Sequence, residues 1–226
     1  MSAAAAEPRG GAKGAAPDLS GHVISAFATP VVNYRWRQAE PVNEALRDCV
    51  LRLERSELAG LTRSNVGGWH SATTFLKRPD AAVKALRDYL TELVTALNRA
   101  MLPDERLTEA AGFELYGWAN VLRFGEYHMQ HTHPGSLWSG VYYVTDNPRI
   151  AGHPSSGKLE LCDPRLAASA LQTPFDALYG RFLLNPSAGQ TVLFPSWLQH
   201  CVHPYFGDDK RISVAFNADW PAAPGR

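Results

Sequence analysis

The pattern of apolar residues changes halfway along the chain, and this change limits the folds that the chain can adopt. Between about residues 40 and 110, apolar side chains recur at helical spacing. Beyond residue 111 they come in short or alternating runs separated by Gly, Pro, Asn and Asp. Helices followed by many short strands are typical of an α+β domain. The order therefore predicts a jelly-roll or barrel core with N-terminal helices packed on its outside.

Two segments carry the helical signal, residues 41–58 (PVNEALRDCVLRLERSEL) and 79–102 (PDAAVKALRDYLTELVTALNRAML). Pro41 suits the first turn of a helix, and Pro103 follows the second segment. Between them, residues 64–75 (SNVGGWHSATTF) read as a Gly-rich loop.

The second half of the chain supplies the predicted strands. They are FELYGWANVLRF, SGVYYVT, GKLELCD, TVLFP and RISVAFNADW, with FATPVVNYRW (residues 27–36) as a further candidate. Because no linker separates the halves, we expect a single domain over residues 21–220, with a helical part at about 40–110 and the jelly-roll core at about 111–220. The Ala/Gly/Pro-rich residues 1–20 read as a disordered lead without the apolar region of a secretory signal.

Composition argues against several classes of partner. The chain has 22 Lys and Arg against 22 Asp and Glu, so no basic field points to nucleic acid. No apolar run reaches membrane-spanning length. Three scattered cysteines do not form a disulfide framework. We therefore expect a cytoplasmic protein that binds neither nucleic acid nor membrane; its oligomeric state is left open.

Histidines gather in HMQHTHPGSLWSGVYYV, directly before a predicted strand. In an extended segment His131 and His133 point to the same face, so both imidazoles can reach one metal ion. A third donor must come from elsewhere, and His200 follows the apolar run TVLFP. His128 is an odd number of residues from both and should face away. His203 reads as a loop histidine.

A carboxylate-binding pair follows the distal histidine. Arg211 and Ser213 lie two residues apart in RISVAF and therefore share one face of that strand. A guanidinium offers a bidentate fork to a carboxylate, and a hydroxyl adds a further donor. Taken alone, Arg211 reads more readily as a surface residue of an edge strand. In combination with the histidines it indicates a site for a metal ion and an acid.

This constellation resembles the Fe(II)/2-oxoglutarate-dependent dioxygenases, whose usual fingerprint is HxD or HxE, then a distal His, then Arg or Lys about ten residues later. The phrases SGVYYVTDNP, SSGKLEL and NPSAGQTVLFPSWLQHCVHPYFGDDKRISVAFN resemble the prolyl-hydroxylase-like branch. The chain resembles more closely a group of bacterial 2OG-Fe(II) oxygenases that share FATPV, SNVGGWHS, HTHPGSxxSGVYYV, LFPSWLxH and RISVAFN. The resemblance covers about residues 27–217.

The resemblance implies a double-stranded β-helix (cupin-like jelly roll), Fe(II) held by His131, His133 and His200, and 2-oxoglutarate and O2 as cosubstrates. It also implies that Arg211 and Ser213 hold the distal carboxylate of 2-oxoglutarate. The sequence departs from the family at His133, which stands where the usual triad has a carboxylate. Alternatives stay open: His128 could replace His131 or His133, and Glu160 or Asp163 could supply an acid from a neighbouring strand.

Further residues are candidates for the cosubstrate and substrate sites. Asn120 and Tyr143 could hydrogen-bond 2-oxoglutarate, although a turn role and core packing explain them as well. Trp69 and His70 in the Gly-rich loop could form a lid over the substrate. Trp138 and Trp197 flank the proposed ligands and could line the cavity, although such residues are more often core. By strand parity Asn217 faces the same side as Arg211.

The resulting expectation is an enzyme that hydroxylates an unactivated C–H bond of a small molecule, amino acid or peptide and releases succinate and CO2. Two alternatives remain at this stage. One is a three-histidine iron dioxygenase that acts without 2-oxoglutarate. The other is a non-catalytic jelly-roll protein that binds a metal or a ligand.

Overall fold

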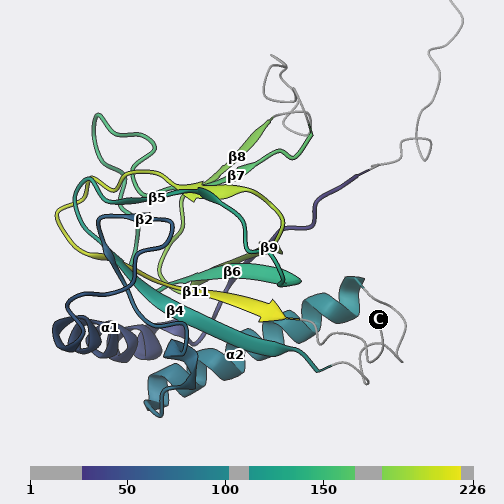
Figure 1. Ribbon diagram of the computed structural model, residues 1–226, viewed down its shortest axis with the longest axis horizontal. Coiled ribbons are helices and arrows are strands. Elements are labelled where there is room, and N and C mark those ends of the chain that lie inside the picture. Colours follow the sequence, from purple (N-terminus) through teal and green to yellow (C-terminus); the bar gives the residue numbers. More distant parts are fainter. Residues whose placement is uncertain (1–26, 102–111, 166–179, 220–226) are drawn as a thin grey trace, which may run out of the picture.

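The computed structural model describes residues 27–101, 112–165 and 180–219 (Figure 1). The predicted lead, residues 1–20, and the last part of the predicted helical region lie outside the described residues. None of the helices among the described residues is long and apolar enough to cross a membrane.

The two predicted helices are present. Helix α1 spans Ala39–Ser56 and helix α2 spans Ala81–Met101, and a short 3-10 helix, η1, lies between them at Phe75–Lys77. Both long helices are amphipathic. Their buried faces carry the apolar residues predicted from helical spacing, including Leu46 and Val50 in α1 and Leu86 and Leu90 in α2.

The strands form two antiparallel sheets. Among the described residues, the major sheet has the order β1-β9-β6-β11-β4-β3 and the minor sheet the order β2-β5-β10-β7-β8. The major strands are β1 (Val32–Arg35), β3 (Trp69–His70), β4 (Glu114–Leu122), β6 (Trp138–Tyr143), β9 (Gln190–Pro195) and β11 (Arg211–Asp219). The minor strands are β2 (Asn65–Val66), β5 (Tyr127–His131), β7 (Leu159–Cys162), β8 (Arg181–Leu184) and β10 (His200–Val202). The predicted double-stranded β-helix with external helices is confirmed.

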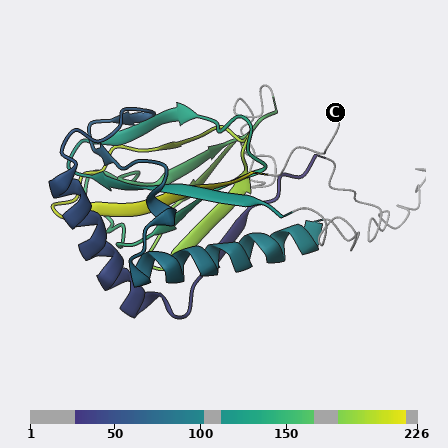
Figure 2. The same ribbon diagram turned by 60° about the horizontal axis from the view of Figure 1, so that its bottom comes forward.

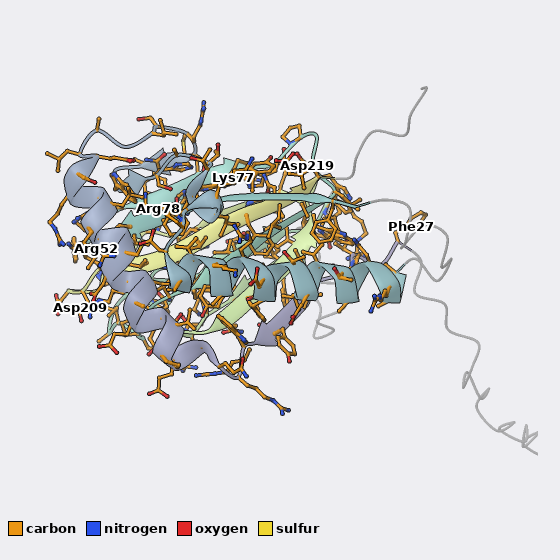
Figure 3. The ribbon with its side chains drawn as sticks, turned by 90° about the horizontal axis from the view of Figure 1, so that it is seen from below. Phe27, Arg52, Lys77, Arg78, Asp209 and Asp219 are labelled. Atoms are coloured by element: carbon orange, nitrogen blue, oxygen red, sulfur yellow. The ribbon has the colours of Figure 1, made fainter. Side chains whose placement is uncertain are left out.

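The molecule has three layers, which Figure 2 shows after rotation: the helices, the major sheet and the minor sheet. One apolar cluster joins α1 and α2 to the outer face of the major sheet. A second, smaller cluster lies between the sheets and includes Leu159, Phe194 and Val202. Seen from the helix side, the charged side chains of Arg52, Lys77 and Arg78 lie in one region, beside α1 and η1 (Figure 3). Arg52 and Arg78 both pair with Asp80, at 3.6 and 3.1 Å.

Side-chain alternation in β11 divides it between two environments. Ile212, Val214 and Phe216 pack towards the helices, whereas Arg211 and Ser213 line a cavity between the sheets. The minor sheet therefore supplies the second wall of a polar cavity.

Sequence patterns found six of the eleven described strands. β4, β6, β7, β9 and β11 each overlap a predicted run, and β1 confirms the further candidate at residues 27–36. β5 was missed because its sequence, YHMQH, is polar, and β10 because it has only three residues. The predicted Gly-rich loop instead contains β2 and β3, which pair with β5 and β4.

Gly117 lies where the major sheet contacts η1, so a substitution at this position tests how closely the two elements pack. A Cβ atom there would stand 2.6 Å from the Ala215 carbonyl oxygen and 2.8 Å from Leu76 Cδ1. We expect Gly117→Ala to lower the free energy of unfolding by about 1–3 kcal/mol, because backbone and a buried Leu must both shift. Urea denaturation measures this change in the free energy of unfolding.

Gly112→Ala is the control, because the new Cβ meets nothing within 4 Å. Its effect on the free energy of unfolding should stay within about 0.5 kcal/mol. Equal effects of the two substitutions would contradict the packing.

Candidate metal centre and cosubstrate pocket

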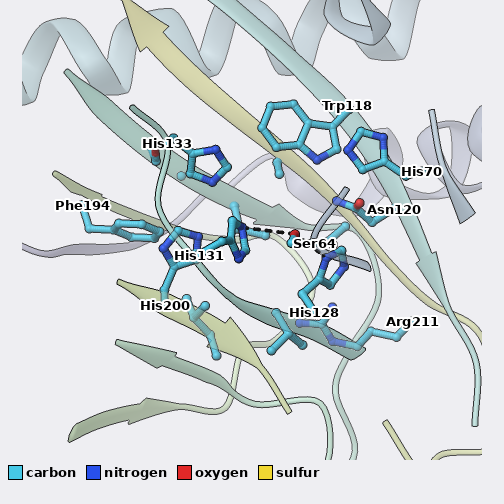
Figure 4. Close-up of a pocket in the computed structure, with 17 residues that line it drawn as sticks. Ser64, His70, Trp118, Asn120, His128, His131, His133, Phe194, His200 and Arg211 are labelled. Carbon is cyan, nitrogen blue, oxygen red and sulfur yellow. Dashed lines mark hydrogen bonds between the residues drawn. The ribbon is translucent and has the colours of Figure 1, made fainter. Parts of the chain in front are cut away.

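A cavity between the two sheets gathers polar side chains from distant parts of the sequence (Figure 4). Three histidines lie at one part of its wall and a buried arginine at another. The lining residues used below are Ser64, His70, Trp118, Asn120, His128, His131, His133, Phe194, His200, Arg211 and Ser213.

The predicted histidine trio converges. His131, His133 and His200 each offer a ring nitrogen, and these atoms all lie within 4.8 Å of one another. His131 ends β5 and His200 begins β10, and the two residues are direct partners in the antiparallel pair. His133 follows β5, where its backbone N–H donates to the Ser196 carbonyl at 3.0 Å. Two strands and one anchored loop thus bring the three rings together.

Backbone carbonyls orient two of these rings. Nδ1 of His131 lies 2.7 Å from the Met129 carbonyl oxygen, and Nδ1 of His200 lies 2.9 Å from the Leu198 carbonyl oxygen. A carbonyl only accepts hydrogen bonds, so each Nδ1 carries the proton and each Nε2 keeps a free lone pair. Such N–H to carbonyl contacts are the usual outer support of metal-binding histidines.

Burial keeps the rings neutral, as metal ligation requires. Desolvation, followed by the neighbouring charge of His131, lowers the pKa of His200 to about 3. The same two causes lower the pKa of His133 to about 4. Burial also lowers the pKa of His131. At neutral pH all three imidazoles therefore present lone pairs.

Arg211 is a buried cation whose charge has no anionic partner among the described residues. Its side chain is among the largest that are fully buried, at 1% exposure, and Nε and Nη2 have no hydrogen-bond partner among the described residues. A buried guanidinium with free N–H groups is costly unless an anion pairs with it. The ring of Tyr143 gives partial compensation, with its centroid 5.3 Å from Cζ. The donor set therefore fits a bound carboxylate.

The other predicted cosubstrate residues surround this guanidinium. Ser213 and Asn120 are paired across β11 and β4 and both line the cavity. Asn120 Oδ1 has no partner among the described residues, which makes this amide a second free polar group at the cavity. Tyr143 lies behind Arg211, and burial raises the pKa of its hydroxyl to about 12. It stays a neutral donor at any physiological pH.

His128 does not face away, and this expectation was wrong. In the antiparallel pairing of β5 with β10, His131 lies opposite His200 and His128 lies opposite Val202. These two pairs are separated by two residues in β10 but by three residues in β5. The extra residue is a bulge, which reverses the side-chain parity. His128 therefore lines the cavity beside Arg211 (Figure 4), and burial, followed by the Arg211 charge, lowers its pKa to about 3. Its nitrogens are not among the three clustered ligand atoms.

The proposed lid is instead part of a sheet. Trp69 and His70 pair with Val121 and Asn120 in the major sheet, so they are fixed there. Trp69 points away from the cavity, and its Nε1 donates to the Glu57 carbonyl at 2.7 Å. His70 does line the cavity, where it stacks on Trp118 at 5.4 Å between ring centroids.

Three other substrate candidates lie outside the cavity wall. Trp138 alternates with Ser139 and so faces α2, where its Nε1 donates to Asn98 Oδ1 at 2.8 Å. Trp197 is exposed and does not line the cavity. Asn217 shares the face of Arg211 but lies further along β11, where its amide bonds Ser139 and Tyr116. Asn217 therefore supports the wall without forming it.

The alternative acidic ligands point elsewhere. Glu160 is the strand partner of Cys201, so it faces the side of the minor sheet opposite to His200. There it contacts His203 at 2.6 Å, which makes His203 more than a loop histidine. Asp163 pairs with Arg165 at 2.5 Å. Neither carboxylate belongs to the group formed by His131, His133 and His200.

Ser64 and Trp118 are functional candidates that sequence reasoning missed. Ser64 Oγ lies 3.3 Å from His131 Nε2 and 3.4 Å from His128 Nδ1. Trp118 lies beside His133, with 5.6 Å between ring centroids. Strand parity with Asn120 could have indicated Trp118. Nothing in the sequence links Ser64 to residues more than 60 positions away.

Comparisons with known proteins agree with this geometry. Residues 116–217, which contain the histidine trio and Arg211, match the family model described as "Putative 2OG-Fe(II) oxygenase". No curated protein matches the chain. Among solved structures, a Pseudomonas putida prolyl-4-hydroxylase is similar, with a TM-score of 0.60 at 17% identity, covering 85% of this chain and 93% of the other.

Two further structures share the fold. One is a Trichoplax adhaerens prolyl hydroxylase in complex with a peptide fragment of a hypoxia inducible factor, with a TM-score of 0.60, 14% identity and coverage of 84% and 83%. The other is HygX from Streptomyces hygroscopicus with nickel, 2-oxoglutarate and hygromycin B bound, with a TM-score of 0.59, 13% identity and coverage of 84% and 83%. The matched family is the 2OG-Fe(II) oxygenases, enzymes that use Fe(II), 2-oxoglutarate and O2, and its model covers slightly less than half of the chain.

The buried histidines give the metal-free protein a defined acid sensitivity. In the unfolded chain a histidine takes up a proton as the pH falls through about 6.5, whereas His128 and His200 in the folded protein resist until about pH 3. Between about pH 6.5 and pH 3 the unfolded chain therefore binds more protons than the folded protein. The free energy of unfolding is highest above this range and decreases as the pH falls through it. We expect a loss of up to about 1.4 kcal/mol per pH unit for each such histidine.

Urea denaturation in the presence of a chelator, at intervals from about pH 7 to pH 4, measures this slope. His200→Gln should make the slope shallower, whereas His153→Gln, an exposed histidine, should leave it unchanged. A slope that His200→Gln does not alter would contradict the assigned protonation states.

Proposed function

We propose that His131, His133 and His200 bind Fe(II), that Arg211 binds the distal carboxylate of 2-oxoglutarate, and that the protein hydroxylates a C–H bond of a small molecule, amino acid or peptide. We further propose that residues 21–220 act as one domain. The observation that carries this proposal is the unpaired guanidinium of Arg211, which lines the same cavity as the three clustered imidazoles.

The protein's own residues position the reactants. His131 and His200 offer Nε2 in fixed orientations, because their Nδ1–H groups are held by backbone carbonyls. Arg211 and Ser213 would clamp one end of the keto acid, and Asn120 offers an unpaired amide oxygen beside them. When bound, Fe(II) with 2-oxoglutarate and O2 supplies an oxidant that takes hydrogen from an unactivated C–H bond, with succinate and CO2 as coproducts.

The ligand set has an electrostatic consequence. Three neutral imidazoles leave the full 2+ charge of the metal, and Arg211 adds a further positive charge to a buried site. A dianionic keto acid compensates this charge better than a neutral ligand would. Binding of the cosubstrate should therefore raise the affinity for the metal ion. Because such coupling is reciprocal, binding of the metal ion should raise the affinity for the cosubstrate by the same factor.

We infer the class of substrate from the side chains that line the cavity near His133. Trp118 lies against His133 and stacks with His70, which forms an aromatic surface beside the metal ligands. Such a surface suits a flat or partly apolar group with few charges. The related structures bind a peptide in one case and hygromycin B in another, so the shared fold accepts both kinds of molecule. We propose His70 and Trp118 as substrate contacts.

A three-histidine dioxygenase that needs no 2-oxoglutarate is the second candidate. The neutral triad favours it, because the usual 2-oxoglutarate enzymes use two histidines and one carboxylate. It leaves the buried, unpaired Arg211 without a role, and for this reason we rank it second.

Release of succinate from 2-oxoglutarate tests the proposal directly. With Fe(II) and ascorbate and no added substrate, we expect slow uncoupled succinate formation. His200→Ala should reduce it at least about 100-fold, since the metal loses one of three protein ligands. His153→Ala, which changes an exposed histidine, should keep the wild-type rate. Oxidation of a thiol substrate without any 2-oxoglutarate would instead support the second candidate.

Substitution of Arg211 separates cosubstrate binding from metal binding. We expect Arg211→Gln to raise the KM for 2-oxoglutarate about 10–100-fold, because hydrogen bonds to a charged group contribute about 1.5–3 kcal/mol. Without cosubstrate the same variant should be more stable than wild type, since it removes an unpaired buried charge. Succinate assays and thermal unfolding with and without N-oxalylglycine measure both effects. Arg35→Gln, at an exposed arginine, is the control. An unchanged KM in Arg211→Gln would refute the assignment.

A further inference from the structure

We propose that the outer face of the minor sheet carries a second metal site of the zinc type, formed by Glu160, Cys201 and His203. Each residue offers one ligand atom, and these atoms all lie within 4.8 Å of one another. The site uses no residue of the cavity between the sheets, and it does not depend on the proposed function.

Strand register places the three side chains together. Cys201 in β10 is directly opposite Glu160 in β7. His203 follows Cys201 by two residues, and its backbone N–H donates to the Lys158 carbonyl at 2.9 Å, so the pairing with the chain before β7 continues. Residues two apart in an extended chain share a face. The arrangement is therefore fixed by the ladder and does not depend on a loop.

The same alternation separates this site from the histidine trio. Cys201 follows His200 immediately, so the two side chains point to opposite faces of the minor sheet. His200 enters the cavity, whereas Cys201 joins Glu160 on the outside. Two potential metal sites thus lie back to back across one strand.

The chemistry of the donors selects the metal. A thiolate, an imidazole and a carboxylate are the side-chain ligands that Zn²⁺ takes in proteins, and three protein ligands leave a fourth position for water. Cys162 follows Glu160 by two residues on the same strand face and is a second thiol beside the site. On binding, the Cys201 thiol would release its proton to solvent and form the metal–sulfur bond.

The Glu160 carboxylate supplies a negative charge for a cation here, and the positive charge of Arg181 compensates part of it. Glu160 is only 8% exposed, although it is an acid on the outer face of a sheet. Its carboxylate contacts His203 Nε2 at 2.6 Å, and Arg181 Nε stands 4.0 Å away. In a tetrahedral site the ligand atoms lie roughly 3.3–3.8 Å apart. The Glu160–His203 contact must therefore open by about 1 Å when the ion enters.

Cobalt distinguishes this site from the cavity site, because only the outer site contains sulfur. We expect the reduced full chain to bind two Co²⁺ ions and to develop a thiolate-to-cobalt charge-transfer band. Cys201→Ser should abolish the band and reduce the stoichiometry to one. The double variant His131→Ala/His200→Ala should keep the band, which shows that it does not arise from the cavity. Cys49→Ser, at a buried cysteine in α1, should also keep it.

Glu160→Gln and His203→Gln provide a second route if Cys201→Ser does not fold. Each should weaken Co²⁺ and Zn²⁺ binding at the outer site at least about tenfold, as measured by competition with a chromophoric chelator. Absence of a charge-transfer band in the wild-type chain would overturn the proposal and leave Glu160–His203 as a simple hydrogen-bonded pair. A band that survives Cys201→Ser, or one that both Gln variants leave unchanged, would overturn it as well.

Discussion

The pairing of His131 with His200 in neighbouring antiparallel strands is the constraint on which the proposed metal centre depends. Direct strand partners have Cβ atoms about 5 Å apart, which is close enough for two imidazoles to share one ion. The ring centroids lie 4.3 Å apart. The bulge beside this pair admits His128 to the same cavity, and the carbonyls of Met129 and Leu198 fix the rings. A three-residue strand, β10, therefore positions a large share of the site.

The cavity is costly for the fold. Neutral, buried histidines and an unpaired guanidinium replace apolar contacts that would stabilise the space between the sheets. The apolar cluster between the sheets is accordingly smaller than the one under the helices. The stability of the molecule rests mainly on the contact of α1 and α2 with the major sheet. The face of the major sheet that contacts the helices therefore stabilises the fold, whereas the opposite face lines the cavity.

Much of the fold, and the clustering of the three candidate histidines, could be predicted from the sequence because each follows from the regular spacing of side chains along a helix or a strand. Helical spacing located α1 and α2, and alternation placed Arg211 and Ser213 on one face. The combined motifs resemble the 2OG-Fe(II) oxygenases, whose family model matches residues 116–217. The failures have equally simple causes. The alternation of side chains along a regular strand predicted the wrong face for His128, because a bulge adds one residue to β5. Trp138 is close in sequence to the histidines, but its side chain lies on the other face of β6 and contacts Asn98.

Other features could not be read from one sequence. Glu160 seemed available as a ligand until register showed that it opposes Cys201. Trp69 and His70 resembled a mobile lid, yet two residues of pairing with β4 fix them in the major sheet. Ser64 reaches the site only through the pairing of β2 with β5. Pairing between distant short strands leaves no local pattern, so these contacts required the structure.

A crystal structure of the full chain with Mn²⁺ and N-oxalylglycine would show directly which groups bind the metal ion and the keto acid. We expect one nitrogen from each of His131, His133 and His200 on the ion, and the distal carboxylate of the analogue paired with the Arg211 guanidinium. An ion held by fewer than these three imidazoles, or an analogue that leaves Arg211 unpaired, would contradict this expectation.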